Sequence, residues 1–286
     1  MLKKNRPLIG GHVSGAGGVS KSIANAKTIG AEVIQIFGAS PRSFQANLTS
    51  DEEALKFKNA MKESAVKKVY LHGAYLVNLA TDKDELFNLS VKNLARHLEI
   101  AEKIGAEGLI FHVGSGKEAP REEAIKKAVK GIRQVLSLVK GKSFLIIENA
   151  AGGGEKLGAT PEDMEKLQTE VNSDRLKFCI DTAHAFEAGQ IESYTTNNIK
   201  KFLDLWDEAI GLKNVVALHI NDSKTEFNSK HDRHENIGEG YIGLEGFKNL
   251  AKEIRIWHAD WILEVPGFLN EGPDKKNIDI LRNCFN

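Results

Sequence analysis

Cysteine is scarce in this chain of 286 residues, which contains only Cys179 and Cys284. Two cysteines cannot form a disulfide framework, and they cannot build a metal site of four thiolates. Neither cysteine lies in a recognisable nucleophile motif, and no G-x-S-x-G or H-E-x-x-H sequence is present. These absences argue against acyl-transfer enzymes and zincin proteases. We expect Cys179, which lies within an apolar run, to pack as a small hydrophobic residue.

Long apolar runs and an excess of charge are also missing. No stretch approaches the roughly 18 apolar residues that a membrane span requires, and the basic start of the chain lacks the apolar core of a signal peptide. The 39 basic residues balance the 39 acidic residues, so the chain is not a globally basic nucleic-acid coat, and any basic surface must be local. Hydrophobic residues make up 41% of the chain, enough for a large core. We therefore expect a soluble, cytoplasmic protein that does not associate with membranes.

Apolar, β-branched runs recur along the chain, and each is followed by a segment with helical periodicity. Most runs are continuous rather than alternating, as in parallel strands that are buried on both faces. The eight predicted strands cover residues 8–11, 32–37, 68–71, 108–111, 143–147, 176–180, 214–218 and 261–263. Amphipathic helical patterns lie between them, for example at 54–64, 90–104, 122–138 and 197–210. The glycines suited to helix C-caps are Gly30, Gly105, Gly141 and Gly211.

Repeated alternation of strand and helix predicts a (β/α)₈ TIM barrel, in a single domain that spans residues 1–286. Such a barrel typically needs about 250 residues. A doubly wound open sheet is the main rival, but the glycine-rich segment 11–18 fits neither G-x-G-x-x-G nor the P-loop pattern. The one long polar connection, at 223–240, exceeds an ordinary turn and is predicted to be functional.

Polar residues stand at the carboxyl end of nearly every predicted strand. These residues are His12, Gln35, His72, His112, Glu148, Asp181, His219 and Glu264. The carboxyl ends of barrel strands meet on one face, where active sites are built. Residues scattered along the chain are therefore expected to face one another.

Imidazoles and carboxylates together favour divalent transition metals over Mg²⁺ or Ca²⁺. Two local pairs, D-x-x-H at 181–184 and D-x-H at 232–234, add further ligands. The nine candidates are His72, His112, Glu148, Asp181, His184, His219, Asp232, His234 and Glu264. A catalytic zinc uses about three protein ligands, so nine side chains suit two or three ions with a bridging carboxylate.

Other polar residues have simpler explanations. His97 lies in a helical pattern and His258 just ahead of the last strand, so both are interpreted as structural or surface residues. Asp222, His231 and Glu235 lie near the predicted ligands, but a solvated loop explains them at least as well.

Short motifs surround most of these positions. They are GHVS at 11–14, LHGAYLVNL at 71–79, FHVGS at 111–115, IENAAG at 147–152, DTAHAF at 181–186, LHIND at 218–222 and DRH at 232–234. DTAHAF and DRH are the most specific. In this order, and over essentially the whole chain, the motifs resemble the endonuclease IV family of apurinic/apyrimidinic-site DNA repair nucleases.

The resemblance implies a TIM barrel that holds three zinc ions, with Mn²⁺ as an alternative at one site. It divides the nine candidates into three sets, which are His72, His112 and Glu148; Glu148, Asp181, His219 and Glu264; and His184, Asp232 and His234. Glu148 bridges two ions and is the candidate catalytic residue, beside the attacking water.

The resemblance also implies the reaction and the substrate. Family members cleave double-stranded DNA on the 5′ side of an abasic sugar, leaving a 3′-hydroxyl and a 5′-deoxyribose phosphate. This interpretation makes the chain a base excision repair enzyme that works at the nucleoid, as a monomer without an obligatory protein partner.

Two loop residues are assigned to DNA by the resemblance. Arg42 and Tyr75 occupy the matching loops after the second and third strands. The chain departs from the family nearby, because Ser43 and Phe44 stand where glutamine and tryptophan are expected, and Val265 is not the commonest residue after the last ligand.

Two other functions fit the same barrel. A sugar isomerase or epimerase of the xylose isomerase-like group would use divalent metals and strand-end carboxylates, but it normally needs fewer imidazoles and one or two ions. The set around Asp232 and His234 argues against it. A non-catalytic binding module with purely structural metals is disfavoured by the number of convergent ligands.

Overall fold

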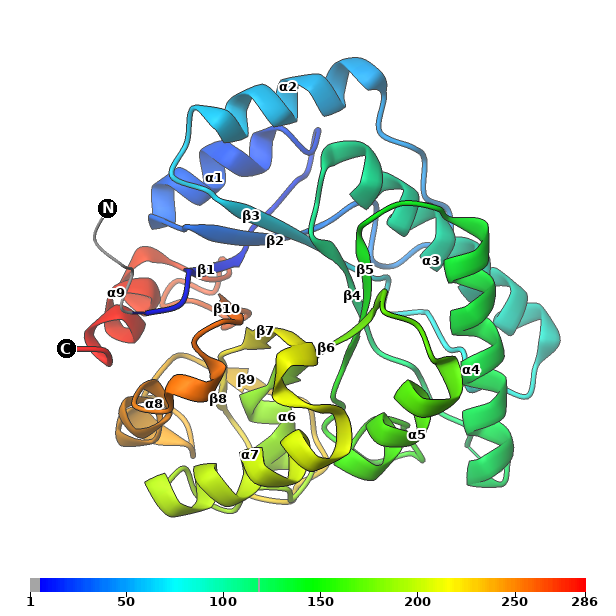
Figure 1. Cartoon of the computed structure of the whole chain (residues 1–286). Helices are drawn as coiled ribbons and strands as arrows, with labels where there is room; N and C mark the ends of the chain where they lie inside the picture. Colours follow the sequence, from blue (N-terminus) through cyan, green and yellow to red (C-terminus); the bar gives the residue numbers. More distant parts are fainter. Residues whose placement is uncertain (1–5, 118) are drawn as a thin grey trace.

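The computed structural model describes residues 6–117 and 119–286 and contains a closed barrel of parallel strands (Figure 1). Its strands are β1 (Ile9–His12), β2 (Val33–Phe37), β3 (Lys68–His72), β4 (Gly108–Phe111), β5 (Phe144–Glu148), β6 (Leu176–Asp181), β7 (Val215–His219) and β10 (Asp260–Leu263). Each predicted strand agrees with the observed one to within one residue at either end. The TIM barrel prediction is confirmed. Of the basic start of the chain, residues 1–5 lie outside the described part.

The barrel closes where the first strand meets the last. β1 pairs with β10 in parallel, with Gly10 opposite Ile262, and with β2 on its other side. A Cβ atom at Gly10 would overlap the carbonyl oxygen of Val33, so only glycine lets these strands approach. Sequence neighbours pair around the rest of the ring, which aligns the carboxyl ends of all its strands.

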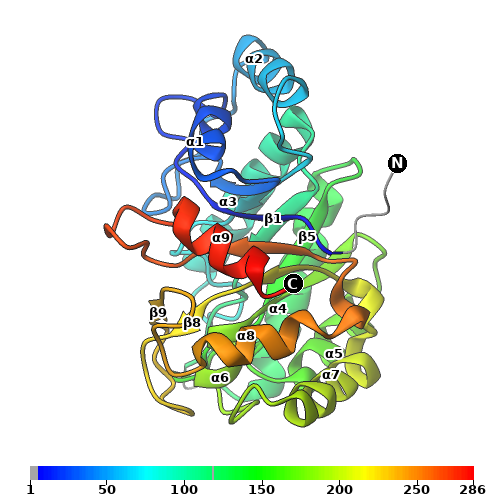
Figure 2. The same cartoon turned by 90° about the vertical axis from the view of Figure 1, so that its left-hand side faces the viewer.

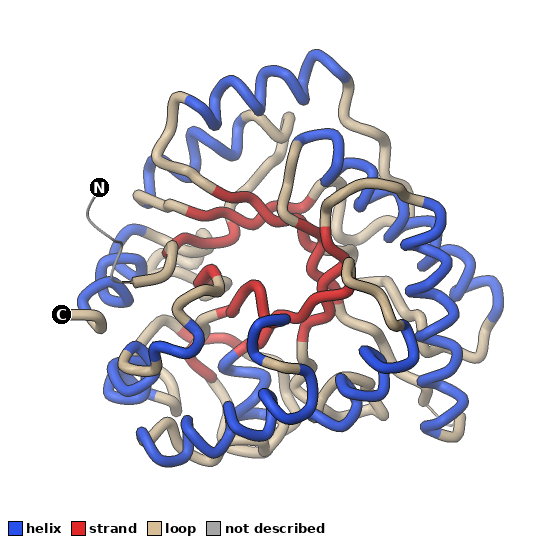
Figure 3. Tube along the Cα trace, in the orientation of Figure 1, coloured by secondary structure: helices blue, strands red, loops and turns tan. Residues whose placement is uncertain are grey.

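Helices surround the barrel in an outer layer (Figure 3). They are α1 (Lys21–Ile29), α2 (Asp51–Lys62), α3 (Asp84–Ile104), α4 (Arg121–Leu138), α5 (Pro161–Val171), α6 (Thr182–Glu187), α7 (Thr196–Ile210), α8 (Gly243–Ala251) and α9 (Lys275–Asn283). Gly30 and Gly105 adopt the predicted left-handed conformation, and Gly211 caps α7 with positive φ. The prediction for Gly141 is wrong, because α4 ends at Leu138 and Val139 is its cap.

Apolar side chains fill two separate regions. The larger core lies between strands and helices, and the smaller one includes Val33, Tyr70, Ile146 and Cys179. Burial raises the pKa of the Cys179 thiol to about 11, in keeping with its predicted role as a small hydrophobic residue. In the part of the chain that the structure describes, no helix is long and apolar enough to cross a membrane.

The connection from β7 to α8 contains a small antiparallel hairpin, β8 (Asp222–Ser223) and β9 (His234–Glu235). Figure 2 shows this hairpin at the same end of the barrel as the loops that follow β1 and β10. Together they enclose the face on which the carboxyl ends of the strands converge.

Candidate metal centre

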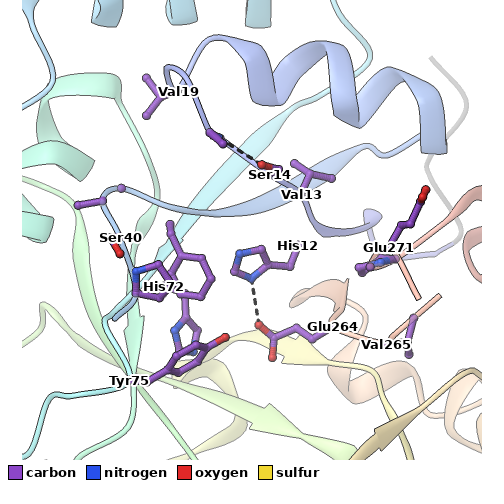
Figure 4. Close-up of a pocket in the computed structure, with 18 of the residues that line it drawn as sticks. His12, Val13, Ser14, Val19, Ser40, His72, Tyr75, Glu264, Val265 and Glu271 are labelled. Carbon is purple, nitrogen blue, oxygen red and sulfur yellow. Dashed lines mark hydrogen bonds and ion pairs between the residues drawn. The ribbon is translucent and has the colours of Figure 1, made fainter. Parts of the chain in front are cut away.

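A cavity of about 1060 Å³ opens at the carboxyl ends of the strands. Figure 4 shows His12, His72, Tyr75 and Glu264 around it, with His12 and Glu264 in contact. The predicted metal ligands in its wall are His72, His112, His184, Asp232, His234 and Glu264. The remaining three, Glu148, Asp181 and His219, are buried beneath them.

Glu148, the last residue of β5, lies between two groups of histidines. Its Oε2 atom is 3.2 Å from Nε2 of His72 and 3.5 Å from Nε2 of His112. Its Oε1 atom is 2.9 Å from Nδ1 of His219 and 3.3 Å from Nδ1 of His184. The two oxygens of one buried carboxylate therefore face different donor groups.

The second group extends from Glu148 to Glu264. Nδ1 of His219 lies 3.2 Å from Oε2 of Glu264 and 3.9 Å from Oδ2 of Asp181. One donor atom from each of these four residues lies within 4.8 Å of every other, a spacing that a single ion can bridge. The group matches the second set implied by the resemblance.

The third group involves the hairpin and α6. Oδ1 of Asp232 is 3.2 Å from Nε2 of His184 and 3.6 Å from Nε2 of His234. Nε2 of His234 is also 3.6 Å from Oδ2 of Asp181. Asp181 caps α6, since its Oδ1 atom accepts the amide of His184 at 2.8 Å. All nine predicted ligands thus lie in one continuous cluster.

Charges within the cluster shift the pKa values of its members. Burial alone would raise the pKa of Glu148, but the imidazoles of His219 and His112 hold it well below its usual value. Burial alone would lower the pKa of His184, but the carboxylates of Asp181 and Asp232 raise it well above its usual value. Buried carboxylates that stay ionised are stable only beside positive charge, which a bound cation can supply.

The donor set fits divalent metal ions. Nε2 of His184 and Nε2 of His234 are buried and have no hydrogen-bond partner among the described residues, although both face Asp232. Buried polar atoms without partners are rare, and an ion is one common reason for them. Imidazole nitrogens and carboxylate oxygens are ligands of zinc and manganese.

Sequence reasoning placed Gln35 and His12 at strand ends but gave neither a role. The Gln35 amide donates to Oε1 of Glu264, and Nε2–H of His219 donates to the Gln35 carbonyl oxygen at 2.8 Å. Because Gln35 holds Nε2–H, Nδ1 is the ring nitrogen that His219 would offer to an ion. Nδ1 of His12 lies 3.2 Å from Oε1 of Glu264. Supporting residues of this kind orient ligands.

Two asparagines that follow predicted strand-end ligands were also missed. Asn221 donates to Oδ2 of Asp181 at 2.7 Å and accepts the amide of Glu264 at 2.7 Å. Oδ1 of Asn149 accepts the backbone amide of Asp181 at 2.5 Å, while the backbone carbonyl oxygen of Asn149 lies 2.9 Å from Nδ1 of His184. The only signal in the sequence was their position directly after, or two residues after, a predicted ligand.

The solvated-loop interpretation is wrong for Asp222. Its carboxylate is buried and accepts the amides of Gly238, Gly240 and Ile242 at 2.9–3.1 Å. His231, by contrast, is exposed.

The two histidines interpreted as structural or surface residues fit that interpretation. His97 is buried in α3 beside the carbonyl oxygen of Asn93. His258 contacts the carbonyl oxygens of Leu212 and Val215.

The two residues assigned to DNA lie on neighbouring loops. Tyr75 is 66% exposed at the cavity wall, and its ring centroid lies 6.2 Å from that of His72. The amide of Tyr75 donates to the carbonyl oxygen of Pro41 at 3.0 Å, which joins the two loops. Arg42 follows Pro41 and its side chain is exposed.

The fold and the site define a TIM barrel with clustered divalent-metal donors at the carboxyl ends of its strands. Residues 23–284 match the family model described as xylose isomerase-like TIM barrel. The chain is 35% identical over 279 residues to the probable endonuclease 4 of Aquifex aeolicus, covering 97% of this chain and 98% of that protein. The probable endonuclease 4 of Thermotoga maritima is 34% identical over 262 residues, which cover 91% of this chain and 91% of that protein.

Solved structures give the same result. Endonuclease IV from Thermus thermophilus superposes with a TM-score of 0.83 at 34% identity, covering 97% of this chain and 98% of that one. The chain therefore belongs to the endonuclease IV family, within the xylose isomerase-like TIM barrels. A D-tagatose 3-epimerase-like protein, at 17% identity and a TM-score of 0.71, shares the fold alone.

Proposed function

We propose that this chain is a metal-dependent endodeoxyribonuclease that hydrolyses the phosphodiester 5′ to an abasic site, leaving a 3′-hydroxyl and a 5′-deoxyribose phosphate. Base excision repair requires this reaction. The observation that carries the proposal is the position of Glu148, whose two oxygens face separate groups of histidines at 2.9–3.5 Å. One carboxylate shared in this way suits two adjacent ions.

In this proposal the nine clustered residues hold three zinc ions, with Mn²⁺ as an alternative at one of them. The first two sets would be His72, His112 and Glu148, and Glu148, Asp181, His219 and Glu264, whose donor atoms lie within 4.8 Å of one another. The third would be His184, Asp232 and His234, which Oδ1 of Asp232 joins at 3.2 and 3.6 Å. Paired divalent ions lower the pKa of water and neutralise charge on the phosphate and leaving oxygen.

Glu148 acts mainly through its charge. Its lowered pKa keeps the carboxylate ionised near neutral pH, so it can hold two ions at once. The same lowered pKa makes it a weak base, so accepting a proton from water is a secondary role. Gln35 and His12 hold Glu264, the second carboxylate that contacts Nδ1 of His219.

The loops beside the cavity provide the contacts to DNA. Arg42 carries an exposed positive charge suited to a phosphate, and Tyr75 presents an exposed ring beside His72. An abasic nucleotide lacks its base and is easily extruded from the duplex, so an inserted ring can fill the space. Phe44 stands where the family has tryptophan, and the Asn93 amide donates to its carbonyl oxygen at 3.0 Å.

No specific observation favours a sugar isomerase or epimerase. The structures of that activity share less than 25% identity with the chain and support only the barrel fold. The additional donors Asp232 and His234 also exceed what one or two ions need.

Metal analysis and product analysis together test the proposal. Purified protein should contain close to three zinc ions per chain, and cleavage of an abasic duplex should leave an end that a DNA polymerase extends directly. One or two Mn²⁺ or Mg²⁺ ions, with epimerisation of a ketose and no DNA cleavage, would replace the proposal by the isomerase alternative. A protein without bound metal would contradict both.

A further inference from the structure

Two of the assigned ligands come from a loop rather than from a strand end. Asp232 and His234 lie in the connection after β7, where Ser223 pairs with His234 in the hairpin. The side chain of Asp232 is 43% exposed. Its alignment with His184 therefore depends on what holds this loop in place.

The end of α6 provides one part of that support. The carbonyl oxygen of Phe186 accepts the amide of Asn228 at 3.1 Å, and that of Glu187 accepts the amide of Lys230 at 3.0 Å. The Lys230 ammonium donates to the carbonyl oxygen of Ala188 at 2.6 Å. The loop is thus docked on the helix that carries His184.

The Glu187 side chain provides the other part. It is fully buried, and its Oε1 atom accepts the Ser223 hydroxyl at 2.8 Å and the Arg233 amide at 3.2 Å. The Thr225 hydroxyl lies 3.3 Å from the same oxygen. Arg233 is the residue between the two loop ligands. The Glu187 carboxylate therefore binds the backbone amide that lies directly between Asp232 and His234.

The second oxygen of Glu187 has a different environment. Oε2 is buried and has no hydrogen-bond partner among the described residues. A carboxylate oxygen of Glu187 also lies within 4.8 Å of donor atoms of His184 and Asp232. Because Glu187 follows His184 by three residues, both side chains lie on one face of α6. Burying this carboxylate is costly unless positive charge lies close by.

We propose that Glu187 is a positioning residue for the ion assigned to His184, Asp232 and His234. Its carboxylate holds the Arg233 amide, and this contact fixes the loop so that both loop ligands point at one ion. The inference rests on the three-ion assignment of the proposed function, and it adds a residue outside the nine ligands.

Graded chelation of the metal-loaded protein tests the inference without DNA. In E187A, one ion should dissociate at about 10–100-fold lower chelator concentration, the loss typical of supporting residues, while the other ions are retained. E187D keeps the carboxylate, but its side chain is one methylene shorter and no longer reaches the Arg233 backbone amide. It should therefore behave like E187A. E187Q keeps an acceptor oxygen and should stay close to the natural protein. E226A, an exposed residue of the same loop, is the matched control.

Hydrogen exchange of the metal-free proteins gives a second readout. Exchange in segment 224–235 should be faster in E187A and E187D than in the natural protein, E187Q or E226A. Unchanged metal retention in E187A, or a loss in E187Q equal to that in E187A, would overturn the positioning role, the latter because charge rather than the hydrogen bond would then matter. A natural protein that binds no ions would instead refute the proposed function itself.

Discussion

Nδ1 of His219 lies 2.9 Å from Oε1 of Glu148, deep beneath the cavity floor, and both side chains are almost completely buried. The same nitrogen lies 3.2 Å from Oε2 of Glu264. This nitrogen therefore faces two carboxylates, and Oε2 of Glu148 extends the contacts to Nε2 of His72. An ion bound at this nitrogen would lie close to both carboxylates and to Asp181.

Replacing Glu148 with glutamine should abolish incision. The amide keeps the shape of the side chain but removes the negative charge that two ions would share. We expect the rate to fall more than about 100-fold, beyond the loss typical of supporting residues, together with a lower metal content. Rates on a single abasic duplex and metal analysis measure this. Glu123→Gln, on the exposed face of α4, is the control. Full activity of Glu148→Gln would refute the assignment of Glu148 as a carboxylate shared by two ions.

Gln35→Leu should weaken binding of the ion assigned to Glu148, Asp181, His219 and Glu264. The substitution removes the acceptor for Nε2–H of His219 and the donor to Glu264. The side chains of both predicted ligands then lose the hydrogen bond that fixes their orientation. Metal affinity or activity should fall about 10–100-fold. Competition with a chromogenic chelator measures the affinity, and Gln134→Leu on α4 controls for general effects. If Gln35→Leu binds metal like the natural protein, the ligand orientation does not depend on this amide.

Arg42→Ala should weaken binding to abasic DNA and reduce its salt dependence. Loss of one phosphate contact lowers the slope of log affinity against log salt by about 0.9. Titrations at several salt concentrations, with metal-loaded protein, measure both quantities. Lys126→Ala removes an exposed positive charge from α4, away from the cavity, and should leave the slope unchanged. An unchanged slope in Arg42→Ala would remove this residue from the phosphate contacts.

His97 should make stability depend on pH. Burial lowers the pKa of His97 in the folded protein, and its Nε2 atom has no partner among the described residues. As pH falls below about 6.5, the unfolded chain takes up this proton first, so the free energy of unfolding decreases. Denaturant titrations of the natural protein and His97→Leu between pH 5 and 8 test this.

In His97→Leu, the slope of the free energy of unfolding against pH should be smaller by up to about 1.4 kcal/mol per pH unit. The comparison concerns the slope, since the substitution also changes packing in α3. Equal slopes in the two proteins would show that His97 does not titrate between pH 5 and 8.

The barrel was predictable because its signal is local and repeated. Each strand is a short apolar run, and the residue that ends it marks the functional face, so Glu148 and His219 could be placed together from spacing alone. Family membership is likewise carried by contiguous motifs such as D-x-x-H at 181–184. Gly141 shows the limit of local signals, since glycine also suits the turn that follows a helix by three residues.

Contacts between distant segments were not predictable. Asp222 looks like a loop residue, yet its buried carboxylate organises the turn at 238–243. Gln35 meets Glu264 across the closure of the barrel, and Glu187 meets Arg233 only because α6 and the hairpin pack together. Such partners are set by tertiary packing, which sequence periodicity does not encode.

The most direct test is incision of a duplex that carries one central abasic-site analogue, before and after prolonged chelation. We predict a single cut on the 5′ side of the lesion, lost when metal is removed and restored when zinc is returned. Metal-replete protein that leaves this duplex intact, or cleavage that survives complete metal removal, would contradict the account.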